Sequence, residues 1–217
     1  MTELADFYLP FQLHVTAGPL ELSPVTDEDI PGLIDLALDG IHPEDEMPFY
    51  YPWTKAAPDT LGRNMAQFYW KARQEFSPGE WTLNLAVRHE GELVGCQDFQ
   101  TNRFHVTLTG ETGSWLAARH QGKGIGTAMR QAICALAFDH FGATEVTSGA
   151  FLDNPRSQRV SEKVGYRPNG THRRQRRLGE LATVQSFRLE PEWLVRGEPL
   201  VVEGLEPMAD WLLFPRK

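Results

Sequence analysis

The chain is short of cysteine, of long apolar runs and of positive charge, and each shortage excludes a class of protein. Cys96 and Cys134 are its two cysteines, and their spacing matches neither a zinc site nor a disulfide framework, so we expect buried free thiols. A run of about 18 apolar residues is absent, and so is a secretory signal at the start, so we expect no membrane span. A formal charge of -8 argues against a general nucleic-acid or acidic-membrane binder. We expect a cytoplasmic protein with a local anion site and no metal.

Length and composition suit a single domain spanning 1–217. One hydrophobic core can serve up to about 250 residues, and 41% of the 217 residues are apolar. Hydrophobic periodicity and turn residues predict an α/β fold with strands at 20–25, 81–87, 93–100, 104–108, 110–116, 145–151 and 183–189, and helices at 30–38, 58–75, 127–141 and 156–164. The segment 197–217 is apolar enough to dock on this domain or on a partner subunit, which allows a homodimer.

A glycine-rich segment lies between the strand ending at Leu116 and the helix from Thr127. It reads Gln121-Gly122-Lys123-Gly124-Ile125-Gly126. Its three glycines let backbone N–H groups approach an anion without interference from a β-carbon. The following helix directs its unpaired first-turn N–H groups and its positive dipole end at the same point. The segment therefore predicts a phosphate-binding loop for a nucleotide-derived ligand.

Two common phosphate loops do not fit this segment. A Walker P-loop needs Ser or Thr directly after Gly-Lys, and here Gly124 follows Gly122-Lys123. A dinucleotide-binding turn needs G-x-G-x-x-G in a βαβ unit, whereas this loop reads G-x-G-x-G after several antiparallel-looking strands. The loop instead resembles motif A of the GNAT superfamily, Q/R-x-x-G-x-G/A, with Gln121, Gly124 and Gly126 at its positions.

A second signature of the same superfamily follows downstream. Asn154 and Ser157 resemble its N-x-x-S, and Glu162-Lys163-Val164-Gly165-Tyr166 resembles the E-K-x-G-F/Y that ends the next helix. Residues 20–190 look most like the branch of bacterial ribosomal-protein N-terminal acetyltransferases. The resemblance implies a mixed, mostly antiparallel, V-shaped sheet flanked by helices. It also implies acetyl-coenzyme A bound where the strands ending near Leu116 and Phe151 splay apart.

The resemblance assigns the co-substrate to residues around this splay. Its pyrophosphate would lie on the amides of the glycine loop, and backbone N–H groups near Leu116 and Ala117 would polarise the thioester carbonyl. Asn154 would bind the pantetheine arm, although its place after a strand also suits a helix-capping turn. The basic residues would pair with phosphates, or are merely solvated. The full expected set is Leu116, Ala117, Gln121, Gly122, Lys123, Gly124, Ile125, Gly126, Thr127, Asn154, Arg156, Ser157 and Arg159.

Acetyl transfer also needs a base for the amine and benefits from a proton for the thiolate. Glu111 is the candidate base, on the same strand face as Trp115 by strict alternation; it could equally be an exposed carboxylate or bind a cationic acceptor. Asp98 is a second candidate. The superfamily's usual acid is a tyrosine seven positions after the motif asparagine, and this chain has Ser161 there. Ser161 or Ser157 could relay a proton instead, or Ser161 could be only a small helix residue.

The segment 40–54 combines acids with large aromatics, namely Glu44, Asp45, Glu46, Phe49, Tyr50, Tyr51 and Trp53. We expect an irregular loop that forms the acceptor-side wall for a cationic amine, or aromatics that cap the core beside solvated acids. The arginine run at 173–177 is expected in a solvated hairpin or at an acidic partner. The function predicted is N-acetyl transfer from acetyl-coenzyme A to a primary amine, of a protein N-terminus or a small molecule, by direct attack on the thioester. A non-catalytic acyl-coenzyme A binding module is the alternative.

Overall fold

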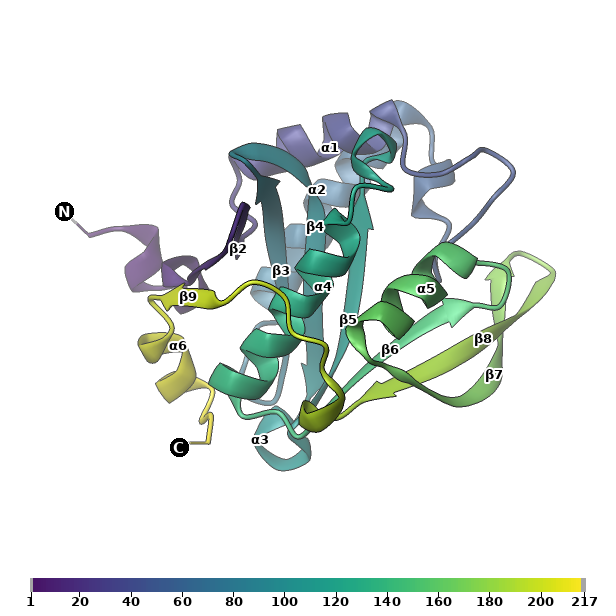
Figure 1. The fold of residues 1–217 in the computed structure, drawn as a ribbon. Coiled ribbons are helices and arrows are strands. Elements are labelled where there is room, and N and C mark those ends of the chain that lie inside the picture. The colour runs from purple at the N-terminus through teal and green to yellow at the C-terminus, as the bar shows by residue number, and fades with distance from the viewer. Residues whose placement is uncertain (1, 216–217) are drawn as a thin grey trace.

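The computed structural model describes residues 2–215, which contain a nine-stranded sheet of order β7-β8-β6-β5-β4-β3-β2-β1-β9. All neighbouring strands are antiparallel except β5 and β6, which are parallel. In Figure 1 the strands β6 to β8 lean away from β3 to β5, so the sheet has the predicted V shape. The strands are β1 (His14–Ala17), β2 (Leu20–Pro24), β3 (Glu80–His89), β4 (Glu92–Asn102), β5 (Thr109–Leu116), β6 (Glu145–Phe151), β7 (Arg167–Arg177), β8 (Glu180–Leu189) and β9 (Leu200–Glu203).

Helices cover both faces of this sheet (Figure 1). α1 and α2 pack on one face around Leu33, Met65 and Cys96, and α4 packs on the other face with the larger core. Cys96 and Cys134 are both buried free thiols, as predicted. The helices are α1 (Asp29–Asp39), α2 (Pro58–Gln74), α3 (Phe104–Thr107), α4 (Ile125–Leu136), α5 (Pro155–Val164) and α6 (Glu206–Trp211).

The ends of α4 and α5 follow from local sequence. α4 begins after Gly124, which has φ 87°, and continues into a π-helical turn that ends at Gly142, with φ 80°. α5 begins after Asn154, whose side chain caps the helix, and ends at Gly165, with φ 103°. These three glycines occupy the left-handed region that other residues rarely adopt. The two helices that border the candidate site therefore begin and end where the sequence indicates.

The parallel contact between β5 and β6 is short. It joins residues 109–111 to residues 145–147 and then stops. Beyond it, Thr112 Oγ1 donates to the Thr147 carbonyl and Ser148 Oγ donates to the Thr112 carbonyl, each at 3.3 Å. β6 remains fully paired with β8 from Val146 to Phe151, so it follows β8 away from β5. We call the point where β5 and β6 part, at Thr112 and Ser148, the fork.

The prediction of a strand at 104–108 is wrong. These residues form the single turn α3, with Arg103 and Leu108 both in the left-handed region at φ 52° and 48°. Phe104 is fully buried and packs against the rings of Trp81 and Phe99, 5.6 and 6.3 Å away between centroids. Burial of this ring in a cluster built from distant parts of the chain outweighs the local strand pattern.

The C-terminal segment docks on the same chain. β9 pairs with β1 along residues 200–203, a pairing that the sequence pattern did not predict. Farther on, Phe214 packs against Trp81, Phe104 and Phe141 with centroid distances of 5.8, 5.3 and 4.9 Å. The last described residues thus cover one end of the main core.

Candidate functional site

The glycine loop directly follows β5 and a short 3-10 turn. Gly122 and Gly124 have φ 76° and 87°, and a β-carbon built on either would meet no atom within 4 Å. Within the described chain, the amide groups of residues 122–126 donate to no protein acceptor. These five N–H groups, backed by the N-terminus of α4, form an open site for an anion.

The amides at the two ends of the predicted anion site, those of Gln121 and Thr127, donate hydrogen bonds within the loop. The Gln121 amide donates to the Ala118 carbonyl at 3.1 Å, and the Thr127 amide donates to the Gly124 carbonyl at 3.0 Å. The side chain of Gln121 donates to the carbonyls of Ile41 and Leu116 at 2.7 and 2.9 Å. Gln121 therefore anchors the loop to β5 and to the loop after α1, and the free amides lie between it and Thr127.

The backbone at the end of β5 offers one donor toward the splay. The Ala117 N–H already donates to the Val94 carbonyl of β4 at 3.0 Å. Because successive N–H groups of a strand point to opposite sides, the Leu116 N–H faces away from β4, toward the side that β6 has left. Of the two predicted carbonyl-polarising amides, Leu116 is the one in position.

Asn154 has a local structural role in this structure. Its Oδ1 accepts the Ser157 amide at 3.1 Å, which caps α5. Its side-chain NH2 group takes part in no hydrogen bond with the described residues. The cap thus leaves the amide donors of Asn154 for a ligand, and the pantetheine role stays a prediction.

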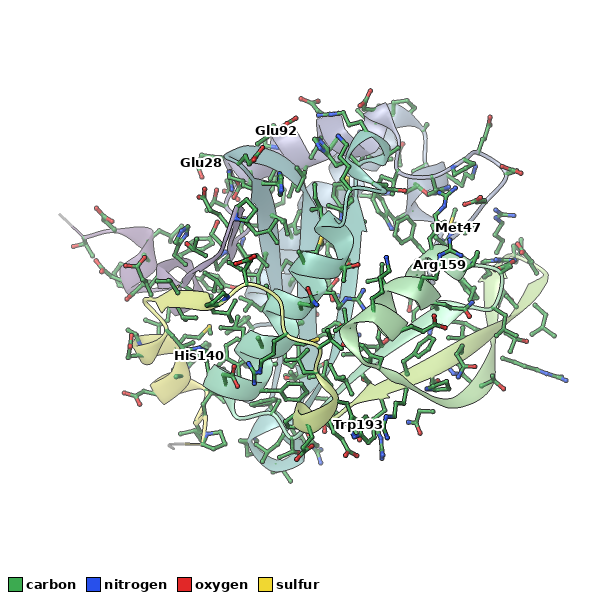
Figure 2. All side chains as sticks on the ribbon, viewed as in Figure 1. Glu28, Met47, Glu92, His140, Arg159 and Trp193 are labelled. Carbon is green, nitrogen blue, oxygen red and sulfur yellow. The ribbon has the colours of Figure 1, made fainter. Side chains whose placement is uncertain are left out.

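The three basic candidates are exposed, one in the glycine loop and two on α5. Lys123 is exposed beside the free amides, and Arg159 is exposed on α5 (Figure 2). Arg156, also on α5, lies 4.0 Å from Glu46. An exposed pair at this distance contributes little to stability, so Arg156 is available to a phosphate.

A single buried arginine fills the fork from the α4 side. Arg130 is 4% exposed, and its Nη1 and Nη2 donate to Ser148 Oγ on β6 and Ser114 Oγ on β5, each at 2.9 Å. Sequence reasoning missed this residue. The available signal was a charge beside Met129 and Ile133 on the apolar face of a helix.

The opposite face of β5 carries the acidic groups. Glu111 shares this face with Trp115, as strict alternation requires, and Asp98 lies across from Gly113 on β4. The Gly113 amide donates to Asp98 Oδ1 at 2.9 Å. Burial raises the pKa of the Asp98 carboxyl to about 6, Glu111 adds to the rise, and the Gly113 hydrogen bond and Arg130 oppose it. Two carboxylates therefore face the same side of the fork.

Tyr50 reaches over β6 from the loop between α1 and α2. A β-carbon built on Gly149 would clash with the Tyr50 hydroxyl, and the ring packs edge-on against Phe151 at 5.6 Å. Burial, followed by the charge of Glu111, raises the pKa of this hydroxyl to about 12. Tyr50 is thus a neutral hydroxyl beside Glu111. The sequence indicated only an aromatic wall, because nothing local links position 50 to position 149.

Arginines of the β7–β8 hairpin hold this loop. The Arg174 guanidinium lies 4.4 Å from the Tyr50 ring centre and 5.2 Å from that of Tyr51. Arg176 donates to both carboxylate oxygens of Asp153, at 2.8 and 2.9 Å, and lies 4.8 Å from the Phe151 ring centre. The arginine run therefore lies in β7, where Arg174 packs on the loop after α1 and Arg176 binds the segment that follows β6.

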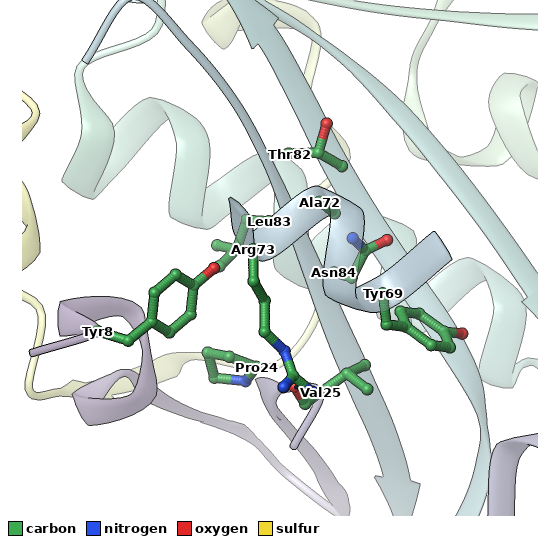
Figure 3. A pocket seen from close by; sticks show the side chains of 9 residues that line it. All are labelled: Tyr8, Pro24, Val25, Tyr69, Ala72, Arg73, Thr82, Leu83 and Asn84. Atoms are coloured by element: carbon green, nitrogen blue, oxygen red, sulfur yellow. Dashed lines mark hydrogen bonds between the residues drawn. The ribbon is translucent and has the colours of Figure 1, made fainter. Parts of the chain in front are cut away.

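A small crevice lies elsewhere, between α2, β3 and the N-terminal residues. Figure 3 shows Arg73 extended across it between Tyr8 and Val25. Arg73 donates to the Val25 carbonyl at 3.0 Å and to Asp27 Oδ1 at 2.6 Å, so its guanidinium ties α2 to the end of β2. No helix within residues 2–215 is long and apolar enough to cross a membrane, and no metal-binding cluster of three His, Cys, Asp or Glu occurs there.

A family model described as the acetyltransferase (GNAT) domain matches residues 20–167. The chain belongs to the GNAT acetyltransferase family. Among curated proteins, YdaF of Bacillus subtilis, named as a candidate ribosomal N-acetyltransferase, is 31% identical over 91 residues. That match spans 42% of this chain and about half, 49%, of the relative.

Solved GNAT structures share the fold. RimJ of Mycobacterium smegmatis, in complex with a coenzyme A disulfide, superposes with a TM-score of 0.67 and 19% identity over 86% of this chain and 88% of its own. A chimera of spermidine N-acetyltransferase SpeG from Vibrio cholerae gives a TM-score of 0.64 and 16% identity over 82% and 100%. These similarities confirm the predicted GNAT-like fold.

One GNAT position departs from the family pattern. Ser161 replaces the tyrosine that the resemblance places there, and it is 1% exposed. Its hydroxyl has no hydrogen-bond partner in the described chain. Tyr166, which ends the same motif, is buried, and its hydroxyl lies 2.9 Å from Thr112 Oγ1 and 3.2 Å from Cys134 Sγ. Proton relay by Ser161 or Ser157 stays a prediction.

Proposed function

We propose that this chain moves an acetyl group from acetyl-coenzyme A to the primary amine of a protein N-terminus or a small molecule. One observation carries the proposal: five consecutive unpaired amides, at residues 122–126, lie directly after the strand that borders the fork. A pyrophosphate suits such amides at a helix N-terminus. The splay of β5 and β6 beside them suits the extended arm of coenzyme A.

The residues at the loop fit this co-substrate. The open space over Gly122 and Gly124 would be filled by any side chain at those positions, which explains glycine there. Lys123 is exposed in the loop and Arg156 at the start of α5, and both would neutralise phosphate charge. Leu116 would donate its N–H to the thioester carbonyl oxygen, where negative charge develops during acyl transfer.

The acidic face suits the acceptor. When bound, acetyl-coenzyme A supplies a thioester carbonyl carbon that a neutral amine can attack. Glu111 would take the proton from the arriving ammonium, directly or through water. Asp98 is ionised at pH 7 and would attract the same cation, and the rings of Tyr50 and Trp115 would enclose it.

Relatives support a cationic amine as the acceptor. RimL, another solved structure with this fold, is named as a ribosomal L7/L12 alpha-N-protein acetyltransferase, and SpeG as a spermidine N-acetyltransferase. An α-amine and spermidine are both cationic amines. Two carboxylates and an aromatic wall suit either class, so the acceptor class is the open choice in this proposal.

A coenzyme A release assay tests the proposal. Wild-type protein with acetyl-coenzyme A would be offered peptides with free N-termini, polyamines and amino sugars. We expect release with at least one class, and a higher melting temperature with acetyl-coenzyme A than with ATP or NAD. Binding without release across the panel would favour the non-catalytic acyl-coenzyme A module, which the buried Ser161 motivates. No thermal shift with acetyl-coenzyme A would overturn the proposal.

A further inference from the structure

The guanidinium of Arg130 has unused donors in a buried place. Two of its five N–H groups bond to the neutral hydroxyls of Ser114 and Ser148, and Nε has no partner among the described residues. No carboxylate of residues 2–215 forms an ion pair with it within 4.0 Å. A buried cation without an anionic partner is costly, so its retention points to a negative charge that arrives with a ligand.

The groups around Arg130 do not supply this charge. Burial raises the pKa of Cys134, one turn along α4, to about 11, and burial also raises the pKa of Tyr166 well above its usual value. Both therefore stay neutral at pH 7. Burial raises the pKa of Asp98 on β4 and the charge of Arg130 opposes the rise, but the two side chains form no ion pair, and the Asp98 carboxylate lies on the other face of the sheet, where it accepts from Gly113.

Arg130 and Glu111 approach the fork from opposite faces. Arg130 bonds to the side chains of Ser114 and Ser148, which point to the α4 side, whereas Glu111 and Trp115 point to the α1–α2 side. An amine that arrives beside Glu111 would expel its leaving group toward the opposite side. Arg130 lies on that side, and within the described chain its positive charge is the only one buried at the fork.

We propose, on the basis of the function proposed above, that Arg130 supplies the fixed positive charge that stabilises the coenzyme A thiolate as it leaves. Once Glu111 has taken the ammonium proton, the amine nitrogen forms a bond to the carbonyl carbon and the carbon–sulfur bond breaks with its electron pair going to sulfur. The second proton of the nitrogen passes to solvent water. Arginine keeps its own protons at any physiological pH, so Arg130 acts by charge and hydrogen bonding, not as an acid. A fixed charge at this place accounts for an acetyltransferase with a buried serine at the position of the usual tyrosine.

The experiment titrates the thiol of coenzyme A bound to the wild type, to Arg130→Met and to Arg196→Met. Arg196 is a matched control because it is a surface arginine paired with Asp139, away from the fork. We expect the bound thiol to ionise at a pH about one unit higher in Arg130→Met than in the other two, since an opposite charge shifts a pKa by about 1–3 units. Above the thiol pKa, coenzyme A should bind Arg130→Met about tenfold more weakly than it binds the wild type. Desulfo-coenzyme A, which has no thiol, should bind both proteins equally well.

Stability measurements separate this role from a structural one. Replacing a buried charge by an apolar residue of similar volume is often tolerated, so Arg130→Met should melt near the wild-type temperature. If Arg130→Met does not fold, Arg130→Lys keeps the charge with fewer donors. The thiol of coenzyme A bound to Arg130→Lys should then keep the lower pKa of the wild-type complex. An equal thiol titration in all folded variants that bind coenzyme A would overturn this inference and leave the proposed function intact. Failure of the wild type to bind coenzyme A would overturn both.

Discussion

At the scale of single residues, two carboxylates on the α1–α2 side of the sheet lie in different surroundings. Glu111 lies on β5 between β4 and β6, in register with Gln100 and Thr147. Asp98 accepts a backbone hydrogen bond from Gly113, and burial raises the pKa of its carboxyl to about 6. The two groups can therefore be tested by different measurements, a rate for Glu111 and a pH-dependent stability for Asp98.

Glu111→Gln removes a base and keeps its shape. We expect kcat to fall about 100-fold, because a positioned general base contributes at least that much. The affinity for coenzyme A should not change, because Glu111 faces away from α4. The checks are coenzyme A release at saturating acceptor and a calorimetric Kd. Glu145→Gln, on the neighbouring strand β6, is the control; equal losses in both variants would remove Glu111 from the mechanism.

Asp98→Asn should change the pH dependence of stability. The pKa of Asp98 rises from 3.8 to about 6 on folding, chiefly through burial. Between these values the folded protein holds a proton that the unfolded chain has released, so wild-type stability falls as pH rises through this range. The asparagine side chain still offers an oxygen to the Gly113 N–H, and it avoids the cost of burying a charged carboxylate. We expect Asp98→Asn, relative to the wild type, to gain on the order of 2 kcal/mol between about pH 4 and pH 8 in urea unfolding. If the free energies of unfolding of the two proteins changed with pH in parallel, this expectation would be contradicted.

At the scale of elements, the glycine loop and α4 act as one unit. Gly122 and Gly124 turn the chain so that five amides remain unpaired, and Gln121 fixes the loop to Leu116 and Ile41. The loop therefore depends little on a bound ligand for its shape. A negative side chain placed at its centre should act on binding more than on folding.

Gly124→Glu tests the loop. Glutamate adds bulk and negative charge where a pyrophosphate would lie, so we expect the affinity for coenzyme A to fall below detection in calorimetry. Gly170→Glu is a matched control, since Gly170 also has positive φ, at 80°, with no atom within 4 Å of a built β-carbon. Each variant carries about 1 kcal/mol of backbone strain, so their melting temperatures should agree. Retained affinity in Gly124→Glu would exclude the loop as the phosphate site.

At the scale of the whole molecule, segments near the two ends of the chain pair at the edge of the sheet and pack on its main core. β9 pairs with β1 at the sheet edge, and Phe214 joins the aromatic cluster of Trp81, Phe104 and Phe141. Phe104 of this cluster lies in α3, so the C-terminal segment packs against that turn. Contacts of this kind join segments that are far apart in the chain, so no local pattern predicts them.

Phe214→Ala should weaken the whole fold. Phe214 is 8% exposed, and truncation of a buried phenylalanine costs about 3 kcal/mol or more. The measurement is the free energy of unfolding in urea. Leu213→Ala is the control, because Leu213 is 65% exposed and its truncation removes little buried surface. Similar losses in the two variants would show that the C-terminal segment does not pack as described.

Much of the architecture followed from local patterns. The glycines at 124, 142 and 165 and the cap at Asn154 marked helix boundaries, and two motifs in the expected order identified the family. The strand predicted at 104–108 was wrong because Phe104 packs in an aromatic cluster built from distant residues. β1 and β9 were missed because strands of four residues carry little periodicity. Alternation alone placed Glu111 on the face of Trp115, whereas the register of β4 against β5 placed Asp98 there.

The sequence by itself identified the family and predicted the glycine loop as an anion site, because each depends on residues close together in the chain. Only the tertiary structure decided that β5 and β6 part after three residue pairs, that Arg130 fills the fork, and that Tyr50 lies over Gly149. These features depend on burial and on contacts between distant segments, whose free energy no local pattern records. The glycine loop predicts what the protein binds, and the packing around the fork determines which side chains can act on it.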